Sequence, residues 1–340
     1  KARLTEEQHQ DASGGLAGLS LEPMDKVFQM PETTNIRAAP KVLSKRVGRI
    51  DAGESLTILA KVSGEHWYLV ETDQGERGFV FADAITLTSG EEKATAKAKN
   101  PAIPDLDYGD YYALVIGNNE YQSLRNLKSA VNDAKVVSTV LEADYGFNVT
   151  FLEDASRSEI LRSLKHLRET ARSEDNVLIY YAGHGHLDPA ENEGYWLPVD
   201  ADRDDPTNWI LTDRITSQVK AMKAKHVMIV ADSCFSGTIT RAIKIEQRTP
   251  EWLSEIVRKK ARTALTSGGI EPVMDSGSGN HSAFAHAFIS LLEENDGVLD
   301  DSQLFSKLRP KVMVNSTQTP QYGKIHMAGD DGGDFLFVRR

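Results

Sequence analysis

From Asp105 to its end, the chain alternates dense apolar runs with segments of helical periodicity, and this alternation restricts the fold more than any other feature. Strands are predicted at Tyr111–Gly117, Asn148–Leu152, Asn176–Ala182, His226–Asp232, Arg262–Thr266 and Phe335–Val338. Helices are predicted at Ala130–Leu141, from the capping-box sequence at Ser156 to about Arg172, at Thr212–Ala221, near Trp252–Lys260 and at Ser282–Glu294. This order predicts an α/β fold with a mostly parallel sheet flanked by helices.

The chain before Asp105 has a different texture. Short β-like runs are separated by turn signals at roughly ten-residue spacing, which predicts a small all-β barrel. These runs are Val42–Leu43, Leu56–Val62, Trp67–Glu71 and Gly78–Phe81. The first residues are polar and contain glycine, and a charged Ala/Lys stretch with two prolines separates the barrel from the α/β part. The predicted segments are a flexible leader at 1–23, a barrel at 24–88, a linker at 89–104 and an α/β domain at 105–340.

Small and polar residues follow the predicted strands at the carboxyl ends, where active sites form in such sheets. Cys234, the single cysteine in the chain, follows one strand, and His184 follows another. An imidazole beside a thiol raises the reactive thiolate fraction, so the two residues favour a cysteine nucleophile with its proton acceptor. The alternative is that Cys234 is a small buried hydrophobe, the commoner fate of a free cysteine.

Glycines flank His184 on both sides, at Gly183 and Gly185. A residue without Cβ lets backbone N–H groups approach a substrate closely, as an oxyanion hole requires. We expect the amides of Gly185 and Cys234 to be the two donors. A tight strand-to-loop turn also explains these glycines, and the two interpretations are compatible.

Several ordered motifs resemble known families. The second part resembles the caspase-like fold, nearest to its prokaryotic, metacaspase-like branch, through Tyr111-Tyr-Ala-Leu-Val-Ile-Gly-Asn-Asn119, Leu127-Lys-Ser-Ala-Val-Asn-Asp133, Tyr180-Tyr-Ala-Gly-His-Gly-His186 and Asp232-Ser-Cys-Phe-Ser-Gly237. The first part resembles the bacterial SH3-like domain, through Asn35-Ile-Arg-Ala-Ala-Pro40, His66-Trp-Tyr-Leu-Val70 and Gly78-Phe-Val80. Such SH3-like domains bind peptides, cell-wall fragments or a neighbouring domain, and the choice stays open here.

The caspase-like resemblance implies a peptidase with a Cys–His dyad and no cofactor, in which Cys234 attacks the scissile carbonyl and His184 handles the proton. Animal caspases cleave after aspartate, whereas metacaspases bind a P1 arginine or lysine with two acids. The matching positions are Asp133 and Asp232. A carboxylate pair suits a desolvated guanidinium and rejects a P1 acid, so we expect cleavage after Arg or Lys. Alternatively, Asp133 only favours its helix dipole from the first turn.

A basic segment follows the nucleophile motif. An enzyme that prefers basic P1 residues could cleave itself there, and the candidate positions are Arg241, Lys244 and Arg248. The equal alternative is that these charges only solvate a loop.

Metal dependence is not favoured. Calcium-dependent metacaspases use an acidic pair before the nucleophile and a carboxylate after it, but the matching stretches here are Leu211-Thr-Asp213 and Thr238-Ile-Thr-Arg241. A cation at the later position opposes Ca²⁺ binding. The acidic run Asp200, Asp202, Asp204 and Asp205 is interpreted as a solvated surface. A zinc hydrolase is the weaker alternative, because His184-Gly-His186-Leu-Asp188 has ligand spacing but is followed by Pro189.

Composition restricts the partners. A net charge of −11 argues against nucleic acid or an anionic membrane as the main partner, and no stretch is apolar enough to span a membrane. The expected partners are protein or peptide substrates, and the resemblance implies a monomer. One cysteine cannot form an intramolecular disulfide, so the compartment stays open between envelope, exterior and cytoplasm. The competing hypothesis is a catalytically silent caspase-like scaffold that recruits partners through the SH3-like domain; the presence of both His184 and Cys234 counts against it.

Overall fold

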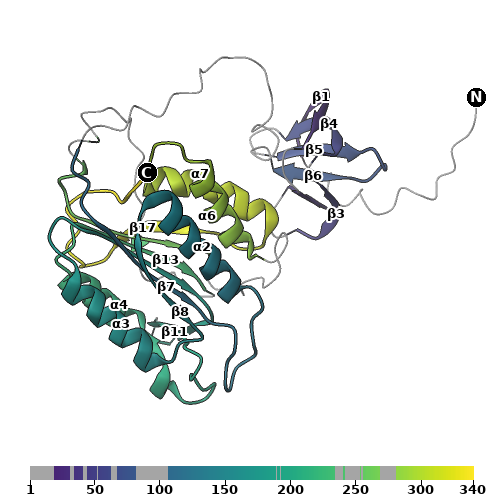
Figure 1. Ribbon diagram of the computed structural model, residues 1–340. Helices are drawn as coiled ribbons and strands as arrows, with labels where there is room; N and C mark the ends of the chain where they lie inside the picture. Colours follow the sequence, from purple (N-terminus) through teal and green to yellow (C-terminus); the bar gives the residue numbers. More distant parts are fainter. Residues whose placement is uncertain are drawn as a thin grey trace, which may run out of the picture. The chain divides into compact units, whose positions relative to one another are not determined.

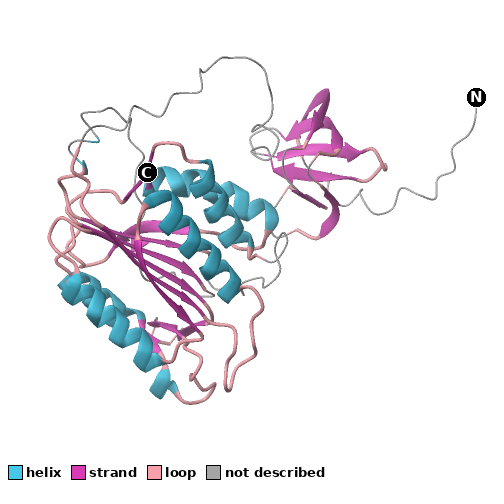
Figure 2. Cartoon of the chain, viewed as in Figure 1, coloured by secondary structure: helices cyan, strands magenta, loops and turns pink. Residues whose placement is uncertain are grey.

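The computed structural model describes residues 19–30, 34–40, 44–51, 53–62, 67–81, 106–188, 190–191, 193–233, 240–241, 253, 256–268 and 281–340. The chain divides into two compact units, residues 1–96 with 313–317, and residues 97–312 with 318–340 (Figures 1 and 2). None of the helices in these described ranges is long and apolar enough to span a membrane.

The first unit contains an antiparallel sheet of six strands in the order β1-β4-β5-β6-β2-β3. Its strands are β1 (Leu21–Gln29), β2 (Thr34–Arg37), β3 (Arg46–Ile50), β4 (Ser55–Val62), β5 (Trp67–Thr72) and β6 (Arg77–Phe81). Alternate residues of β4 are buried, as a one-sided core requires. The all-β expectation is confirmed. The first strand begins inside the expected leader, at Leu21, and the run Val42–Leu43 lies outside the described residues.

The second unit is built on a seven-stranded sheet in the order β14-β17-β15-β13-β9-β7-β8. Five neighbouring strands run parallel: β7 (Tyr111–Gly117), β8 (Asn148–Glu153), β9 (Asn176–Ala182), β13 (His226–Asp232) and β15 (Ala261–Thr266). Two antiparallel strands extend one edge, β17 (Gln321–Ile325) and β14 (Thr240–Arg241). The sheet is therefore mostly parallel, as predicted.

Helices cover both faces of this sheet (Figure 1). One face carries α2 (Ala130–Tyr145), α6 (Ala283–Glu294) and α7 (Asp301–Asn315), and the other carries α3 (Arg157–Thr170) and α4 (Thr212–Ala221). Successive residues of β7 enter opposite cores, with Val115 on the α2 side and Ile116 on the α3 side. Burial on both faces explains why these strands are continuous apolar runs.

Several short elements were not predicted. A three-stranded sheet contains β10 (Gly185–Asp188), β11 (Glu193–Trp196) and β12 (Ile210–Leu211), and a single 3₁₀ turn, η1, spans Pro206–Asn208. The last predicted strand is β18 (Leu336–Val338), which pairs with β16 (Val298–Asp300) in a separate two-stranded sheet. The predicted helix near Trp252–Lys260 ends too late, because residues 257–260 form turns and bends before β15.

Candidate active site

The central strands β9 and β13 deliver the candidate residues to one edge of the sheet. They pair in parallel, with Asp232 opposite Ala182, so His184 and Ser233 both follow the same edge. The two loops also touch, since Gly183 N–H donates to the Asp232 carbonyl at 3.3 Å. Parallel strand ends therefore bring together residues that are distant in sequence.

Part of the predicted site lies outside the described residues. These positions are Cys234, Lys244 and Arg248. Arg241 is described in its backbone alone, as the end of the edge strand β14. The contacts of His184, Gly185, Asp133 and Asp232 are described, and they define the rest of the site.

Two tyrosines hold the backbone of His184. Its N–H donates to Tyr121 Oη at 2.7 Å, and Tyr181 Oη donates to its carbonyl at 2.7 Å. The Tyr121 ring also packs against the imidazole, with ring centroids 4.6 Å apart. A Cβ on Gly183 would lie 2.8 Å from both hydroxyl oxygens. Only a residue without Cβ at position 183 lets the Tyr121 and Tyr181 hydroxyls lie this close to the backbone, whatever the role of Gly183 in the turn.

A main-chain carbonyl selects which nitrogen of the neutral His184 imidazole carries the hydrogen. His184 Nε2 lies 2.7 Å from the Arg125 carbonyl oxygen. A carbonyl only accepts, so Nε2 carries the hydrogen and Nδ1 is the nitrogen that takes up a proton. The sequence analysis could not predict the Arg125 carbonyl as a partner, because every residue has a backbone carbonyl and the residue type does not mark this one.

The Gly185 amide points away from the neighbouring strand. Gly185 pairs with Trp196 across β10 and β11, and Leu197 N–H donates to the His184 carbonyl at 3.0 Å. In an antiparallel ladder, this bond makes Gly185 and Trp196 a non-hydrogen-bonded pair. Since β10 is an edge strand, the Gly185 N–H faces outward from the three-stranded sheet.

The two predicted pocket acids meet at the start of α6. Asp133 is 0% exposed and Asp232 is 3% exposed. Ser282, the N-cap of α6, joins them: its Oγ donates to Asp232 Oδ2 at 2.5 Å, and its N–H donates to Asp133 Oδ2 at 3.2 Å. His281 Nδ1 lies 2.5 Å from Asp133 Oδ1. The sequence prediction found both acids but gave no role to Ser282 or His281.

Burial makes it costly in free energy to ionise the carboxyl groups of Asp133 and Asp232. Desolvation raises the pKa of Asp232 to about 6, and the nearby Asp133 charge adds to the shift. Desolvation also raises the pKa of Asp133, although the hydrogen bonds from His281 and Ser282 oppose it. Among the described residues, Asp232 Oδ1 accepts no hydrogen bond. A buried, unpartnered carboxylate oxygen is satisfied best by an incoming cation with N–H donors.

The residues of the metal hypotheses do not converge. His186 packs against Trp209, with ring centroids 4.7 Å apart, and Asp188 Oδ1 accepts the Ala190 N–H in a turn. The acidic run also serves local structure: Asp200 accepts the Arg157 N–H, and Asp205 accepts the Thr207 N–H. In the described ranges, His184, His186 and Asp188 form no group of potential metal ligands.

The fold and the residues at its strand ends define an α/β protein with a candidate catalytic histidine beside a buried acid pair. The caspase domain family model matches residues 110–329, and the chain belongs to this family. The bacterial SH3 domain model matches residues 32–86. The chain therefore combines a caspase-like domain with an SH3-like domain, and membership of the caspase family implies a cysteine peptidase that acts on protein substrates.

The curated relatives include metacaspases. Metacaspase-1A of Aspergillus oryzae is 24% identical over 297 residues, which cover 65% of this chain and 69% of the relative. Metacaspase-1 of Meyerozyma guilliermondii is 30% identical over 149 residues, covering 37% and 35%, respectively. Metacaspase-6 of Arabidopsis thaliana is 28% identical over 170 residues, covering 44% and 42%. The chain thus spans about two thirds of the first relative and well under half of the others.

Two solved structures align with part of the chain. Caspase-1 from Spodoptera frugiperda aligns with a TM-score of 0.49 at 16% identity, over 68% of this chain and 92% of that one. A protein from Geobacter sulfurreducens aligns with a TM-score of 0.48 at 17% identity, over 68% of this chain and all of that one.

Proposed function

We propose that the chain is a cysteine endopeptidase that cleaves proteins or peptides after Arg or Lys. Cys234 is the nucleophile, and His184 is the general base and then the general acid. The observation that carries the proposal is the buried pair Asp133 and Asp232, which lies at the sheet edge that also carries His184. The proposed organisation keeps the SH3-like domain at 24–88, a linker at 89–104 and the catalytic domain at 105–340.

The proposed chemistry needs two half-reactions. His184 Nδ1 accepts the Cys234 proton while Nε2–H stays bonded to the Arg125 carbonyl. The thiolate attacks the scissile carbonyl carbon, and the Gly185 and Cys234 amides donate to the resulting oxyanion. The imidazolium then protonates the leaving amine, and a water deprotonated by His184 hydrolyses the thioester.

The acid pair supports selection of a basic P1 side chain. Two carboxylates joined through Ser282 offer several acceptor oxygens to a guanidinium, and Asp232 Oδ1 has no hydrogen-bond partner of normal geometry in the described part of the chain. A P1 aspartate would add a third negative charge to a desolvated site. Such a charge is strongly rejected.

Self-processing after a basic residue follows from the same specificity. The candidates are Arg241, Lys244 and Arg248. The backbone of Arg241 pairs with Lys324 in the sheet, which disfavours cleavage there because a protease needs an accessible extended segment. We therefore expect Lys244 or Arg248 to be cleaved before Arg241.

The deciding experiment compares fluorogenic peptides that differ only at P1, Arg against Asp, with the wild type and Cys234→Ala. Cleavage of the Arg peptide that disappears in Cys234→Ala supports both the nucleophile and the pocket. Cleavage of the Asp peptide contradicts the roles of Asp133 and Asp232. Activity on neither peptide, with calcium present or absent, favours the scaffold that recruits partners through its SH3-like domain.

A further inference from the structure

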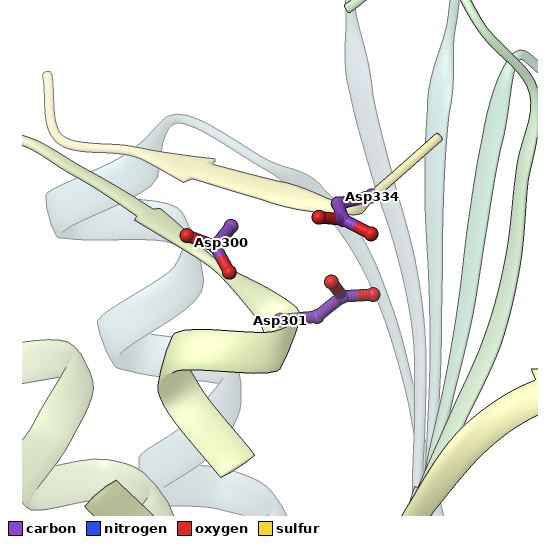
Figure 3. Close-up of side chains that lie close together, drawn as sticks. All are labelled: Asp300, Asp301 and Asp334. Carbon is purple, nitrogen blue, oxygen red and sulfur yellow. The ribbon is translucent and has the colours of Figure 1, made fainter. Parts of the chain in front are cut away.

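Two features of the second unit lie outside the proposed peptidase chemistry, and the first of them serves the fold. Asp300, Asp301 and Asp334 lie close together where β16 meets α7 (Figure 3). Thr263 Oγ1 donates to Asp301 Oδ2 at 2.6 Å, and the Asp301 N–H donates to the Phe335 carbonyl at 2.9 Å. These hydrogen bonds fasten the start of α7 to β15 and to the residue before β18. The second feature is the edge strand β8.

One side of the β8 backbone is open. Among the described strands, β8 pairs with β7 alone. In a parallel ladder, alternate residues direct both their N–H and their C=O to the same neighbour. The Asp154 N–H donates to the Gly117 carbonyl at 2.9 Å, so the even-numbered residues of β8 face β7. Val149, Phe151 and Glu153 therefore direct their N–H and C=O groups outward, away from the sheet.

This edge lacks the usual protection of an outermost strand. Proteins protect such edges with lysine, proline, bulges or very short strands. The β8 sequence Asn-Val-Thr-Phe-Leu-Glu contains neither lysine nor proline, and its ladder with β7 is unbroken. At the opposite edge of the described sheet, β14 contains two residues. An open edge of this length is suited to an extended polypeptide, whose backbone matches the spacing of its N–H and C=O groups.

A groove lies between the β8 edge and helix α3. Its volume is about 710 Å³, a size typical of binding sites, and its lining includes the apolar residues Tyr112, Leu114 and Leu167. Asn148 and Thr150 also line it, and both are exposed on the α3 face of β8. Helix α3 therefore leaves part of this face uncovered. A strand added about 4.8 Å from β8 would place every second side chain over the groove.

The α3 side of the groove is basic. Arg162 and His166 lie one turn apart on α3, and both line the groove. Arg162 is exposed and forms no salt bridge with a described residue. The other charged residue of the lining, Glu142, belongs to α2. An added strand would therefore meet positive charge where its side chains approach α3, and apolar side chains at the base of the groove.

We propose that the β8 edge binds an extended segment of a partner protein, which adds to the sheet as a further strand and presents acidic side chains to α3. A second copy of this chain fits less well. Its own β8 would present Asn148 and Thr150 to the same face, and these short polar side chains neither fill the apolar lining nor pair with Arg162. The interaction uses neither Cys234 nor the acid pair, so it is independent of the proposed function.

Fluorescence anisotropy of the labelled peptide Thr-Asp-Thr-Leu-Thr-Asp-Thr with the full chain tests the proposal. Its Asp and Leu side chains share one face of a strand, and it contains no Arg or Lys for the proposed peptidase to cleave. We expect saturable binding. Two further peptides are N-methylated, one at the Thr residues and the other at Asp and Leu. Only one of them should lose affinity, by about tenfold or more, because only alternate N–H groups of an added strand face β8.

Arg162→Glu tests whether the peptide occupies the groove. We expect about fivefold weaker binding, as for an exposed ion pair, whereas Lys165→Glu reverses a charge on the same helix outside the groove and should retain the affinity. Hydrogen-exchange mass spectrometry should show slower exchange of residues 148–153 when the peptide is bound.

Three results would overturn the proposal: no saturable binding, equal affinities of the two N-methylated peptides, or equal affinities of the two charge-reversal variants. Protection of residues 148–153 that increases with protein concentration in the absence of peptide would also overturn it, and would assign the edge to a second copy of the chain.

Discussion

Three groups of His184, namely its backbone N–H, its carbonyl and its Nε2, are each engaged by a different partner. Tyr121 accepts its N–H, Tyr181 donates to its carbonyl, and the Arg125 carbonyl takes its Nε2 hydrogen. The two tyrosines position the backbone of His184, and the Arg125 carbonyl selects the tautomer of its imidazole. The sequence could identify His184, but the Arg125 carbonyl is invisible to it because every residue has one.

Tyr121→Phe tests how the backbone of His184 is held. The variant keeps the packed ring but leaves the His184 N–H without its acceptor, so we expect kcat to fall by about tenfold, equivalent to about 1.4 kcal/mol. The matched control is Tyr112→Phe, since Tyr112 lies on β7 away from these contacts. Steady-state kinetics on the P1 Arg peptide measures both. Equal activity of the two variants would contradict the role of Tyr121.

The pH dependence of substrate binding should report Asp232. Its pKa is raised to about 6, so its carboxylate is ionised at neutral pH and takes up a proton as the pH falls through that value. We expect KM for the P1 Arg peptide to rise below about pH 6, because a growing fraction of Asp232 is then protonated and cannot pair with the guanidinium.

Asp232→Asn is the companion variant for this pH dependence. It should lose most Arg cleavage and show a flat KM profile across the same range. Ionising the buried Asp232 carboxyl lowers the free energy of unfolding. This loss grows from about pH 4 to about pH 6 and stays constant at higher pH, because the pKa of Asp232 is raised to about 6. Asp232→Asn has no charge to bury, so it should melt several degrees higher than the wild type at neutral pH. If the KM of the wild type stayed constant from pH 5 to 8, a range of about three pH units that includes the pKa of Asp232, the role of Asp232 in binding the P1 side chain would be contradicted.

Among the secondary-structure elements, predictability follows burial and length. The predicted bounds of β7, β9, β13 and α4 agree with the structure, because long runs buried on both faces or a clear helical period leave little ambiguity. Strands as short as β12 have no readable period. The helix α7 contains Pro310, which lacks a backbone N–H and normally argues against a helix.

The acid pair also shows which part of the site local sequence can predict and which part depends on packing. Asp133 and Asp232 are predicted from the resemblance to metacaspases; Asp133 lies in the first turn of α2 and Asp232 ends β13. Ser282 reads from sequence only as a helix N-cap, and it does accept the Ala285 N–H at 2.9 Å. Its second role, joining acids from two other elements, depends on where α6 packs, and local sequence does not contain that information.

Gly183→Ala should disturb the end of β9 more than the fold. The new methyl group would meet the hydroxyls of Tyr121 and Tyr181, both of which hold the His184 backbone. We expect kcat/KM to fall by about a hundredfold or more with a smaller change in Tm, because misplacement of a catalytic group is costly.

Gly48→Ala in β3 is the matched control for this variant. Its methyl group mainly meets the movable end of the Glu76 side chain, so activity should be retained. Kinetics and thermal melting of both proteins distinguish the outcomes. Full activity of Gly183→Ala would contradict the proposed constraint.

For the whole molecule, membership of the caspase domain family and the geometry around His184 favour thiol chemistry over zinc chemistry. With calcium present, iodoacetamide should abolish the peptidase activity, whereas phenanthroline, which removes zinc, should leave it unchanged. Retained activity after complete alkylation of Cys234, verified by mass spectrometry, would contradict the nucleophile. Loss of activity with phenanthroline alone would instead support the zinc alternative.

The central position of β9 and β13 has a consequence for how the molecule opens. Every residue of both strands is buried, and each strand is flanked by others, whereas β8 lies at the sheet edge with exposed residues. Amide protons of β9 and β13 should therefore exchange with solvent only when the whole domain unfolds, and those of β8 should exchange earlier. Hydrogen-exchange mass spectrometry can measure this order. If it holds, the strands that carry the base and the pocket acid are the last to lose their structure, so local fluctuations at the periphery leave the reactive end of the sheet assembled.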